Sequence, residues 1–276
     1  MDRIRLIASD MDATLLDEHS CLPAGFEQTV RALAALGIRF APASGRPLYT
    51  LEELFPTLRD ELVFIGDNGG AIRWKGQNLF TSEMSPEGWR ALNRLTREQG
   101  DIAVLCGLES AYVERPFAVH DAVLRHFYTK IEYVDRLEDV TAPADKFTIY
   151  LPQHNAQQAY DTVYASQRSI YSVAVAGECW VDIMNPGVHK GAALQTLGQL
   201  WGLPSESIMA FGDTYNDAEM LRTAKYGFLM ENGSEPLRQK VPFLAPSHRE
   251  AGVMQVLHRV LAQNGCVCPE DFVPAH

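Results

Sequence analysis

Short apolar runs that stop at polar residues alternate with longer amphipathic segments in the first and last thirds of the chain. The first run covers residues 4–8 and stops at Ser9-Asp10. Similar runs cover residues 38–43, 62–65, 208–212 and 226–230. Apolar runs of this length, bounded by polar clusters, are typical of strands buried on both faces of a parallel sheet.

The segments between these runs have apolar residues three or four positions apart, a spacing that predicts helices. In the first segment Phe26, Val30 and Leu33 share one face, and Gly37 is suited to the C-terminal cap. Further helices are predicted at residues 48–55, 191–200, 218–224 and 252–261, and a hairpin at residues 71–80. Strands that alternate with helices predict an α/β fold with a doubly wound, Rossmann-like parallel sheet.

The pattern changes in the middle of the chain, where helices and strands are mixed without regular alternation. The predicted helices cover residues 89–99, 118–128 and 156–166, and the predicted strands cover residues 102–106, 111–113, 146–151, 170–175 and 180–184. Ser85-Pro86 and Asn185-Pro186-Gly187 bracket this block. We therefore expect residues 85–186 to form an inserted α+β cap domain with hinges at its ends, and residues 1–84 and 187–276 to form the core.

Composition narrows the class of protein. Of the 276 residues 46% are hydrophobic, yet no segment approaches the ~20 apolar residues that a transmembrane helix needs. The first apolar run is too short for a secretion signal, and five scattered cysteines favour reduced thiols over a disulfide framework. The sequence therefore predicts a cytoplasmic protein without a membrane partner.

The net charge of −11, with Lys and Arg dispersed, argues against a nucleic-acid partner, because binding to the phosphate backbone needs a basic stripe. An anionic small molecule would also be repelled unless a local positive site attracts it. A bound divalent cation is one way to supply that charge where carboxylates cluster.

Polar side chains follow three of the predicted parallel strands. Asp10 and Asp12 follow the first strand, Ser44 follows the second, and Asp213 and Asp217 follow the strand at residues 208–212. Because the carboxyl ends of parallel strands share one edge of a sheet, the four carboxylates can converge on a hard cation such as Mg²⁺. Each residue also has a simpler interpretation. An isolated Asp-x-Asp is usually a solvated turn, Lys190 alone is more often solvated, and Ser44 alone is more often a helix N-cap.

Together these residues resemble four motifs of the haloacid dehalogenase-like phosphohydrolases, in particular the Cof-type branch with a large α/β cap. The matching segments, in order, are Asp10-Met11-Asp12-Ala13-Thr14, Ser44-Gly45-Arg46, Lys190-Gly191 and Gly212-Asp213-Thr214-Tyr215-Asn216-Asp217. The chain departs from the family pattern at Ala13, where Gly is usual, and at Glu231, where Gly-Asn is usual. If the backbone of Ala13 needs a positive φ, it carries a strain of about 1 kcal/mol.

The resemblance implies a Mg²⁺-dependent phosphatase that hydrolyses small phosphorylated metabolites, such as sugar or cofactor phosphates. Asp10 would be the nucleophile that forms an aspartyl phosphate, and Asp12 the general acid and base. The metal would be held by Asp10, the main-chain carbonyl of Asp12, and Asp213, with Asp217 behind them. The implied phosphate-binding residues are Thr14, Ser44, Gly45, Lys190 and Asn216.

Specificity would come from the cap, which we expect to move as a lid. Candidate substrate contacts are Arg46, Trp180 and Asp182, although a core-packing role for Trp180 and Asp182 stays open. A phosphomutase of similar architecture and a non-catalytic binding protein also stay open as functions. A dehalogenase would lack a carboxylate at Asp12. The sequence does not specify the oligomeric state.

Overall fold

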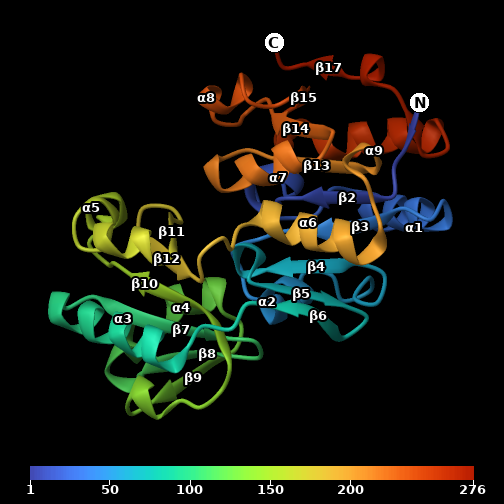
Figure 1. The fold of residues 1–276 in the computed structure, drawn as a ribbon. Coiled ribbons are helices and arrows are strands. Elements are labelled where there is room, and N and C mark those ends of the chain that lie inside the picture. Colours follow the sequence, from blue (N-terminus) through green and yellow to red (C-terminus); the bar gives the residue numbers. More distant parts are fainter.

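The computed structural model describes residues 1–276 and contains two six-stranded sheets that share no strand. Figure 1 shows the two sheets in separate lobes, with both chain termini in the lobe of the first sheet. That sheet has the strand order β17-β15-β14-β13-β2-β3, and all of its pairings are parallel except the one between β15 and β17. The strands are β2 (Leu6–Ser9), β3 (Arg39–Pro42), β13 (Ile208–Gly212), β14 (Tyr226–Met230), β15 (Phe243–Ala245) and β17 (Val273–Pro274).

Helices cover both faces of this sheet, so the predicted doubly wound α/β fold is confirmed. Side chains of α1 (Phe26–Ala35) and α9 (Gly252–Ala262) pack in one hydrophobic cluster, and those of α6 (Lys190–Trp201) and α7 (Ala218–Thr223) pack in another. Along β2, Ile7 belongs to the first cluster, whereas Leu6 and Ala8 belong to the second. This alternation buries the strand on both faces and explains its continuous apolar run.

The run at residues 62–65 forms a strand, β4 (Val63–Gly66), but this strand does not extend the parallel sheet. It pairs antiparallel with β5 (Ala71–Trp74), which pairs in turn with β6 (Gln77–Thr81), and a single bridge between Ala43 and Ile65 connects it to the chain after β3. The tight turn that follows β4 folds β5 back beside one edge of β4, while the other edge meets the chain after β3 at this bridge. The helix α2 (Leu48–Glu53) lies between β3 and β4 in the chain.

The second sheet is built entirely from the middle of the chain, in the order β11-β12-β10-β7-β8-β9. Its strands are β7 (Ile102–Gly107), β8 (Ala111–Glu114), β9 (Ile131–Val134), β10 (Ala144–Tyr150), β11 (Ser172–Val175) and β12 (Trp180–Met184). The helices of this lobe are α3 (Pro86–Gln99), α4 (Asp121–Phe127) and α5 (Ala156–Asp161). Two hydrophobic clusters belong to this lobe alone.

Two helix predictions in this lobe are too long. The first turns of the helix predicted at 118–128 are a 3-10 helix, Arg115–His120, that precedes α4. The helix predicted at 156–166 ends at Asp161, and a second 3-10 helix, Ala165–Ser169, follows. The remaining α-helix is α8 (Glu235–Arg238), and the remaining strands are β1 (Asp2–Arg3) and β16 (Cys266–Val267).

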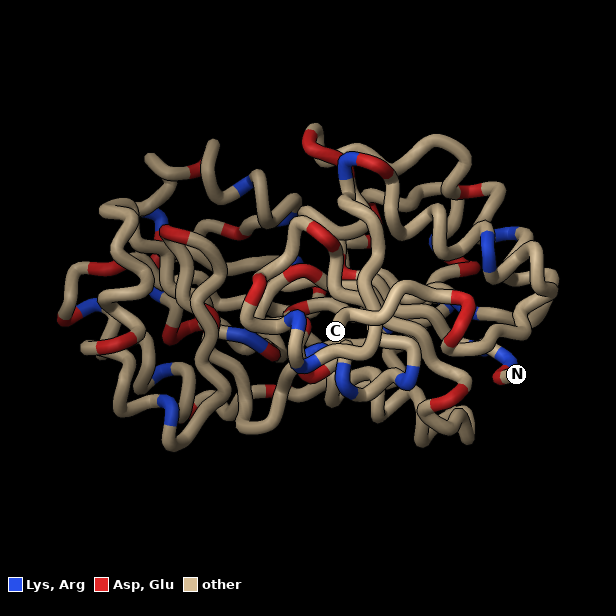
Figure 2. Tube along the Cα trace, turned by 90° about the horizontal axis from the view of Figure 1, so that it is seen from above, with Lys and Arg blue, Asp and Glu red and all other residues tan.

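None of the helices has the length and apolar character that would let it cross a membrane. Figure 2 shows Lys and Arg interspersed with Asp and Glu along both lobes. The dispersed charge expected from the sequence is therefore also dispersed in space. All five cysteines are free thiols.

Candidate functional site

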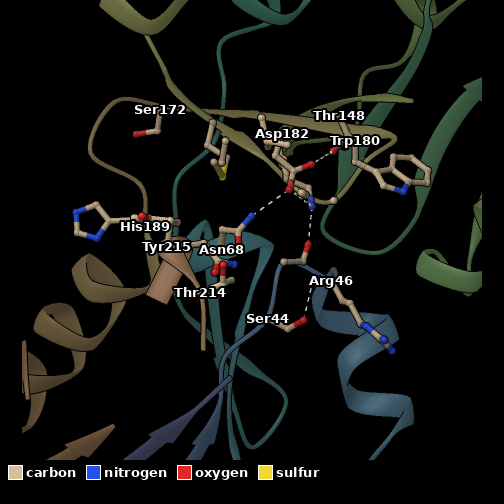
Figure 3. Close-up of a pocket in the computed structure, with 18 of the residues that line it drawn as sticks. Ser44, Arg46, Asn68, Thr148, Ser172, Trp180, Asp182, His189, Thr214 and Tyr215 are labelled. Atoms are coloured by element: carbon tan, nitrogen blue, oxygen red, sulfur yellow. Dashed lines mark hydrogen bonds and ion pairs between the residues drawn. The ribbon is translucent and has the colours of Figure 1, made fainter. Parts of the chain in front are cut away.

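A cavity of about 960 Å³ lies between the two lobes and is lined by residues of both. The ends of β2, β3 and β13 contribute Asp10, Ser44 and Asp213. Figure 3 shows Ser44 and Arg46 on the core side, Thr148 and Trp180 on the opposite side, and Asn68 between them. The polar ends of the parallel strands therefore meet at one edge, as the sequence predicts.

Three carboxylates gather beneath this cavity. Asp10, Asp213 and Asp217 each offer an oxygen atom, and these atoms lie within 4.8 Å of one another. Burial raises the pKa of Asp10 to about 8, and the Asp217 carboxylate adds to the shift while Lys190 opposes it. Burial and Asp217 also raise the pKa of Asp213 to about 6. Because a bound divalent cation would favour the ionised carboxylates, this oxygen-rich group fits Mg²⁺ chemically.

Lys190 is the first residue of α6 and is completely buried, so the simpler interpretation of it as a solvated side chain is wrong. Its ammonium donates hydrogen bonds to Oδ1 of Asp10 and, at 2.7 Å, to Oδ1 of Asp217. Burial lowers the pKa of Lys190, but the two carboxylates outweigh this effect and raise it overall. Lys190 therefore stays charged and holds the two carboxylates on either side of it.

Asp217 also supports the loop that carries Asp213. Its second oxygen accepts hydrogen bonds from the backbone N–H of Asp213 at 3.1 Å and of Thr214 at 3.2 Å. Because Lys190 donates to the first oxygen, both oxygens of the Asp217 carboxylate accept hydrogen bonds within the protein. The oxygens free to bind a ligand are therefore mainly those of Asp10 and Asp213.

Asp12 does not join the acidic cluster. Its carboxylate pairs with the guanidinium of Arg46 at 2.9 Å, and its side chain is 57% exposed whereas that of Arg46 is 11% exposed. Both residues line the cavity. The structure therefore places Arg46 next to the predicted acid and base. A metal-binding role for the Asp12 carbonyl stays a prediction.

The turn after Asp10 has a positive φ at Ala13, the position where glycine is usual in the family. Ala13 has φ 57° and ψ 12°, in the left-handed region that costs a residue with a Cβ about 1 kcal/mol. The side-chain amide of Asn232 donates to the carbonyl oxygen of Ala13 at 2.9 Å, and its own oxygen accepts from the backbone N–H of His248. Of the usual Gly-Asn pair, the glycine is replaced by Glu231 and the asparagine is kept as Asn232. The side chain of Asn232 holds the turn at Ala13 through these hydrogen bonds.

The predicted phosphate-binding residues differ in their access to the cavity. Ser44, Gly45 and Asn216 line it, whereas Thr14 and Lys190 do not. The Thr14 hydroxyl donates to Oδ1 of Asp213 at 3.3 Å and is buried. The Ser44 hydroxyl accepts from the backbone N–H of Arg46 at 3.1 Å, and α2 begins only after Pro47, so Ser44 is not a helix N-cap.

The second lobe contributes an aromatic end and a polar patch to the cavity. Trp180 lies against Tyr150, with ring centroids 4.6 Å apart, and meets Phe127 edge-on. Asp182 accepts hydrogen bonds from the Thr148 hydroxyl at 2.8 Å and from the Asn68 amide at 3.0 Å. Figure 3 shows His189 and Tyr215 at the opposite end of the cavity from Trp180.

Sequence reasoning did not identify Lys146, Asp67 or Asn68 as part of the site. Lys146 and Asn68 line the cavity, and Asp67 is buried beside them. One signal was available for Lys146, since a lysine beside the apolar residues of a buried strand needs a buried partner. Asp67 and Asn68 follow β4 and have the form of an ordinary turn, so nothing comparable marked them in the sequence.

Comparison with known proteins matches residues 7–257 to a family described as haloacid dehalogenase-like hydrolase. A protein of Escherichia coli named 5-amino-6-(5-phospho-D-ribitylamino)uracil phosphatase is 32% identical, with 94% of this chain and 96% of that protein covered. The HMP-PP phosphatase of Cronobacter sakazakii is 30% identical, with 87% and 89% covered.

Solved structures have the same architecture. SMU.1108c from Streptococcus mutans superposes with a TM-score of 0.85 at 29% identity, covering 94% of this chain and 99% of that one. A haloacid dehalogenase-like hydrolase from Bacillus subtilis superposes with a TM-score of 0.80 at 18% identity, covering 93% and 100%, which supports the fold alone.

Proposed function

The chain belongs to the haloacid dehalogenase-like hydrolase family and is a phosphoric monoester hydrolase, and we propose that it acts on small phosphorylated metabolites through a phosphoenzyme on Asp10. The observation that carries this proposal is the cavity of about 960 Å³, which has Asp10 in its lining and is lined by both lobes. A space of this size suits a small molecule rather than a folded protein or a nucleic acid.

Asp10 is suited to the role of nucleophile by its position and its partner. Lys190 bonds Oδ1 of Asp10, which leaves Oδ2 free to attack a phosphorus atom. A carboxylate that approaches a phosphate dianion is repelled by about 4 kcal/mol per pair of unit charges at ~4 Å and an effective dielectric of ~20. Lys190 offsets part of this repulsion.

Mg²⁺ fits the carboxylates of Asp10 and Asp213, with Asp217 and Lys190 holding them in place. When bound, the ion would supply further positive charge against the phosphoryl oxygens. Burial raises the pKa values of Asp10 and Asp213, and a bound divalent cation would favour the ionised form of both carboxylates.

The reaction we propose has two steps. In the first, an oxygen of Asp10 forms a bond to phosphorus, the bond to the leaving oxygen breaks, and Asp12 donates a proton to that oxygen. In the second, Asp12 takes a proton from water as the water oxygen attacks phosphorus, which releases inorganic phosphate and the Asp10 carboxylate. Arg46 orients Asp12 between these steps through its ion pair.

Ser44 and Asn216 are proposed to hold the phosphoryl oxygens. Both line the cavity, and the Ser44 hydroxyl and the side-chain N–H groups of Asn216 are donors of the kind that phosphoryl oxygens accept. Thr14 would act indirectly, because its hydroxyl bonds Asp213.

We further propose that residues 85–186 act as a cap domain on a core formed by residues 1–84 and 187–276, and that the cap selects the substrate. Trp180 and Phe127 offer aromatic surface to the cavity, while Asp182 offers a carboxylate. A phosphate ester with a polar chain and a flat ring would fit this combination. The name of the Escherichia coli relative describes a substrate in which a phosphoribityl chain is joined to a uracil ring.

The experiment is a screen of phosphorylated metabolites with purified protein, with and without EDTA. It should include the 5-amino-6-(5-phospho-D-ribitylamino)uracil and the HMP-PP named for the relatives, sugar phosphates, and a folded phosphoprotein. We expect turnover of small esters that disappears in EDTA and returns with Mg²⁺. Full activity in metal-free buffer would contradict the metal assignment. Fast hydrolysis of the phosphoprotein would contradict the proposal that the cap restricts the substrate to small molecules.

A further inference from the structure

A second buried lysine lies at the contact between the two lobes. Lys146 is in β10 of the second lobe, and only 1% of its surface is exposed. Its ammonium reaches across to the core, where it donates to the carbonyl oxygen of Gly45 at 2.6 Å and pairs with Oδ1 of Asp67 at 2.9 Å. On its own side it lies 3.6 Å from Oδ2 of Asp182.

Three protein oxygens surround the ammonium of Lys146. The contact with Gly45 is a hydrogen bond, and the carboxylates of Asp67 and Asp182 contribute as ion pairs. Burial alone lowers the pKa of Lys146, but Asp182 and Asp67 raise it well above its usual value, so the side chain stays charged. Lys146 lines the cavity, but its hydrogen bond and its ion pairs all go to groups of the protein. These contacts give it a role in holding protein groups in place.

The group that it holds is the loop Ser44-Gly45-Arg46, whose three consecutive carbonyls each accept one hydrogen bond. The Ser44 carbonyl accepts from the backbone N–H of Asn68 at 2.9 Å, and the Arg46 carbonyl accepts from that of Asp67 at 3.0 Å. Both donors belong to the core. The middle carbonyl, of Gly45, accepts from Lys146 of the second lobe.

The core turn that supports this loop is itself held by Lys146. Asp67 and Asn68 both have positive φ, of 50° and 55°, a conformation that needs outside support in residues with a side chain. Lys146 pairs with the Asp67 carboxylate, and Asp182 accepts from the Asn68 amide. The second lobe therefore contacts both the loop and the turn on which the loop rests.

We propose that Lys146 is a positioning residue that completes the phosphate-binding loop Ser44-Gly45-Arg46 when the second lobe is docked on the core. Undocking would remove the hydrogen bond to Gly45 and the ion pair to Asp67 together. Phosphate binding and closure of the cavity are thereby linked through one side chain. This inference rests on the proposed phosphatase function, because it assigns phosphate binding to that loop.

The test measures the inhibition constant of orthovanadate against hydrolysis of p-nitrophenyl phosphate. Vanadate mimics the phosphoryl group and has no leaving group, so its affinity reports on the loop and not on contacts with the rest of a substrate. Lys146→Met removes the ammonium and keeps most of the side-chain volume. Lys146→Met/Asp67→Asn also removes the carboxylate that would otherwise be left unpaired, and protects the measurement against a variant that fails to fold.

Arg73→Met is the matched control. Arg73 is also a buried cation that joins the lobes, since it pairs with Glu52 of the core at 3.6 Å and with Glu109 of the second lobe at 2.5 Å. It has no contact with the loop Ser44-Gly45-Arg46. A variant that only loosens the docking of the lobes should therefore resemble Arg73→Met.

We expect the inhibition constant of vanadate to rise about tenfold or more in both Lys146 variants, because small misplacements in a binding site cost this much. Arg73→Met should stay within about threefold of the wild type. Wild-type affinity in a folded Lys146 variant, or an equal loss in Arg73→Met, would overturn the proposal. A wild-type protein that hydrolyses no phosphate ester would instead overturn the proposed function, and this inference with it.

Discussion

The ammonium of Lys190 lies 2.7 Å from Oδ1 of Asp217, and neither side chain has any exposed surface. Lys190 comes from the start of α6, whereas Asp217 comes from the loop after β13. Removing one member of such a pair leaves a buried charge without a partner, which costs more than the pair contributes when intact.

Lys190→Met should therefore lower the free energy of unfolding by about 3–5 kcal/mol, and should abolish phosphatase activity. Lys190→Met/Asp217→Asn should recover part of the stability, because one unpaired carboxylate is removed, but none of the activity. Urea unfolding and hydrolysis of p-nitrophenyl phosphate measure the two effects. A single variant as stable as the wild type would show that the pair does not support the fold.

Asp145 gives a prediction for the dependence of stability on pH. Burial, and next the carboxylate of Asp67, raise the pKa of Asp145 well above its usual range. The unfolded chain releases this proton near the ordinary value of about 3.9, while the folded protein keeps it. The folded state then binds more protons than the unfolded state, so stability falls as pH rises above about 4, by at most about 1.4 kcal/mol per pH unit.

Asp145→Asn cannot release this proton. The stability of the variant relative to the wild type should therefore increase as pH rises above about 4, and this relative gain should disappear at lower pH. Asp60→Asn, at an exposed position, is the control and should not show this gain. Thermal unfolding across the pH series is the measurement. A constant difference between Asp145→Asn and the wild type at every pH would contradict the raised pKa.

Asp12→Asn should reduce turnover of alkyl phosphates by roughly 10²–10⁴-fold, the usual contribution of a general acid and base. The first-step loss should be smaller for p-nitrophenyl phosphate, because its leaving group needs no proton. Single-turnover kinetics on both classes of ester separate this step from release of phosphate. Equal first-step losses on the two classes would count against Asp12 as the acid.

Ala13→Gly should stabilise the protein by about 0.5–1 kcal/mol, since glycine tolerates the positive φ and its greater freedom in the unfolded chain offsets part of the gain. Ala251→Gly is a matched comparison, because Ala251 has φ 52° and Ala13 has φ 57°. Both variants should gain stability by a similar amount in urea unfolding. A loss at Ala13 alone would mean that its methyl group contributes packing that outweighs the strain.

The convergence of Asp10, Ser44 and Asp213 could be predicted because it follows from topology alone. Each residue ends an apolar run, and parallel strands bring their carboxyl ends to one edge. The burial of Lys190 could not be derived from spacing alone. It depends on α6 packing beside the loop after β13, and only the resemblance to a family indicated that this lysine joins the site.

Features that depend on contact between the lobes escaped sequence reasoning. Lys146 and Asp67 are 79 residues apart in the sequence, and their ion pair exists only because the second lobe docks on the core. Short elements were also missed. The strands β15, of three residues, and β9, of four, were not predicted. The pairing of β4 with β5 was decided by the turn between them, which the apolar run itself does not encode.

Asp10 should carry the phosphoryl group during turnover. Mass spectrometry of protein quenched in acid during hydrolysis of p-nitrophenyl phosphate with Mg²⁺ detects such a group, and in Asp12→Asn it should accumulate because the second step slows without its base. We expect a phosphoryl group on the peptide that contains Asp10, and none in Asp10→Asn. Steady turnover by Asp10→Asn, or a phosphoryl group on another residue, would contradict it.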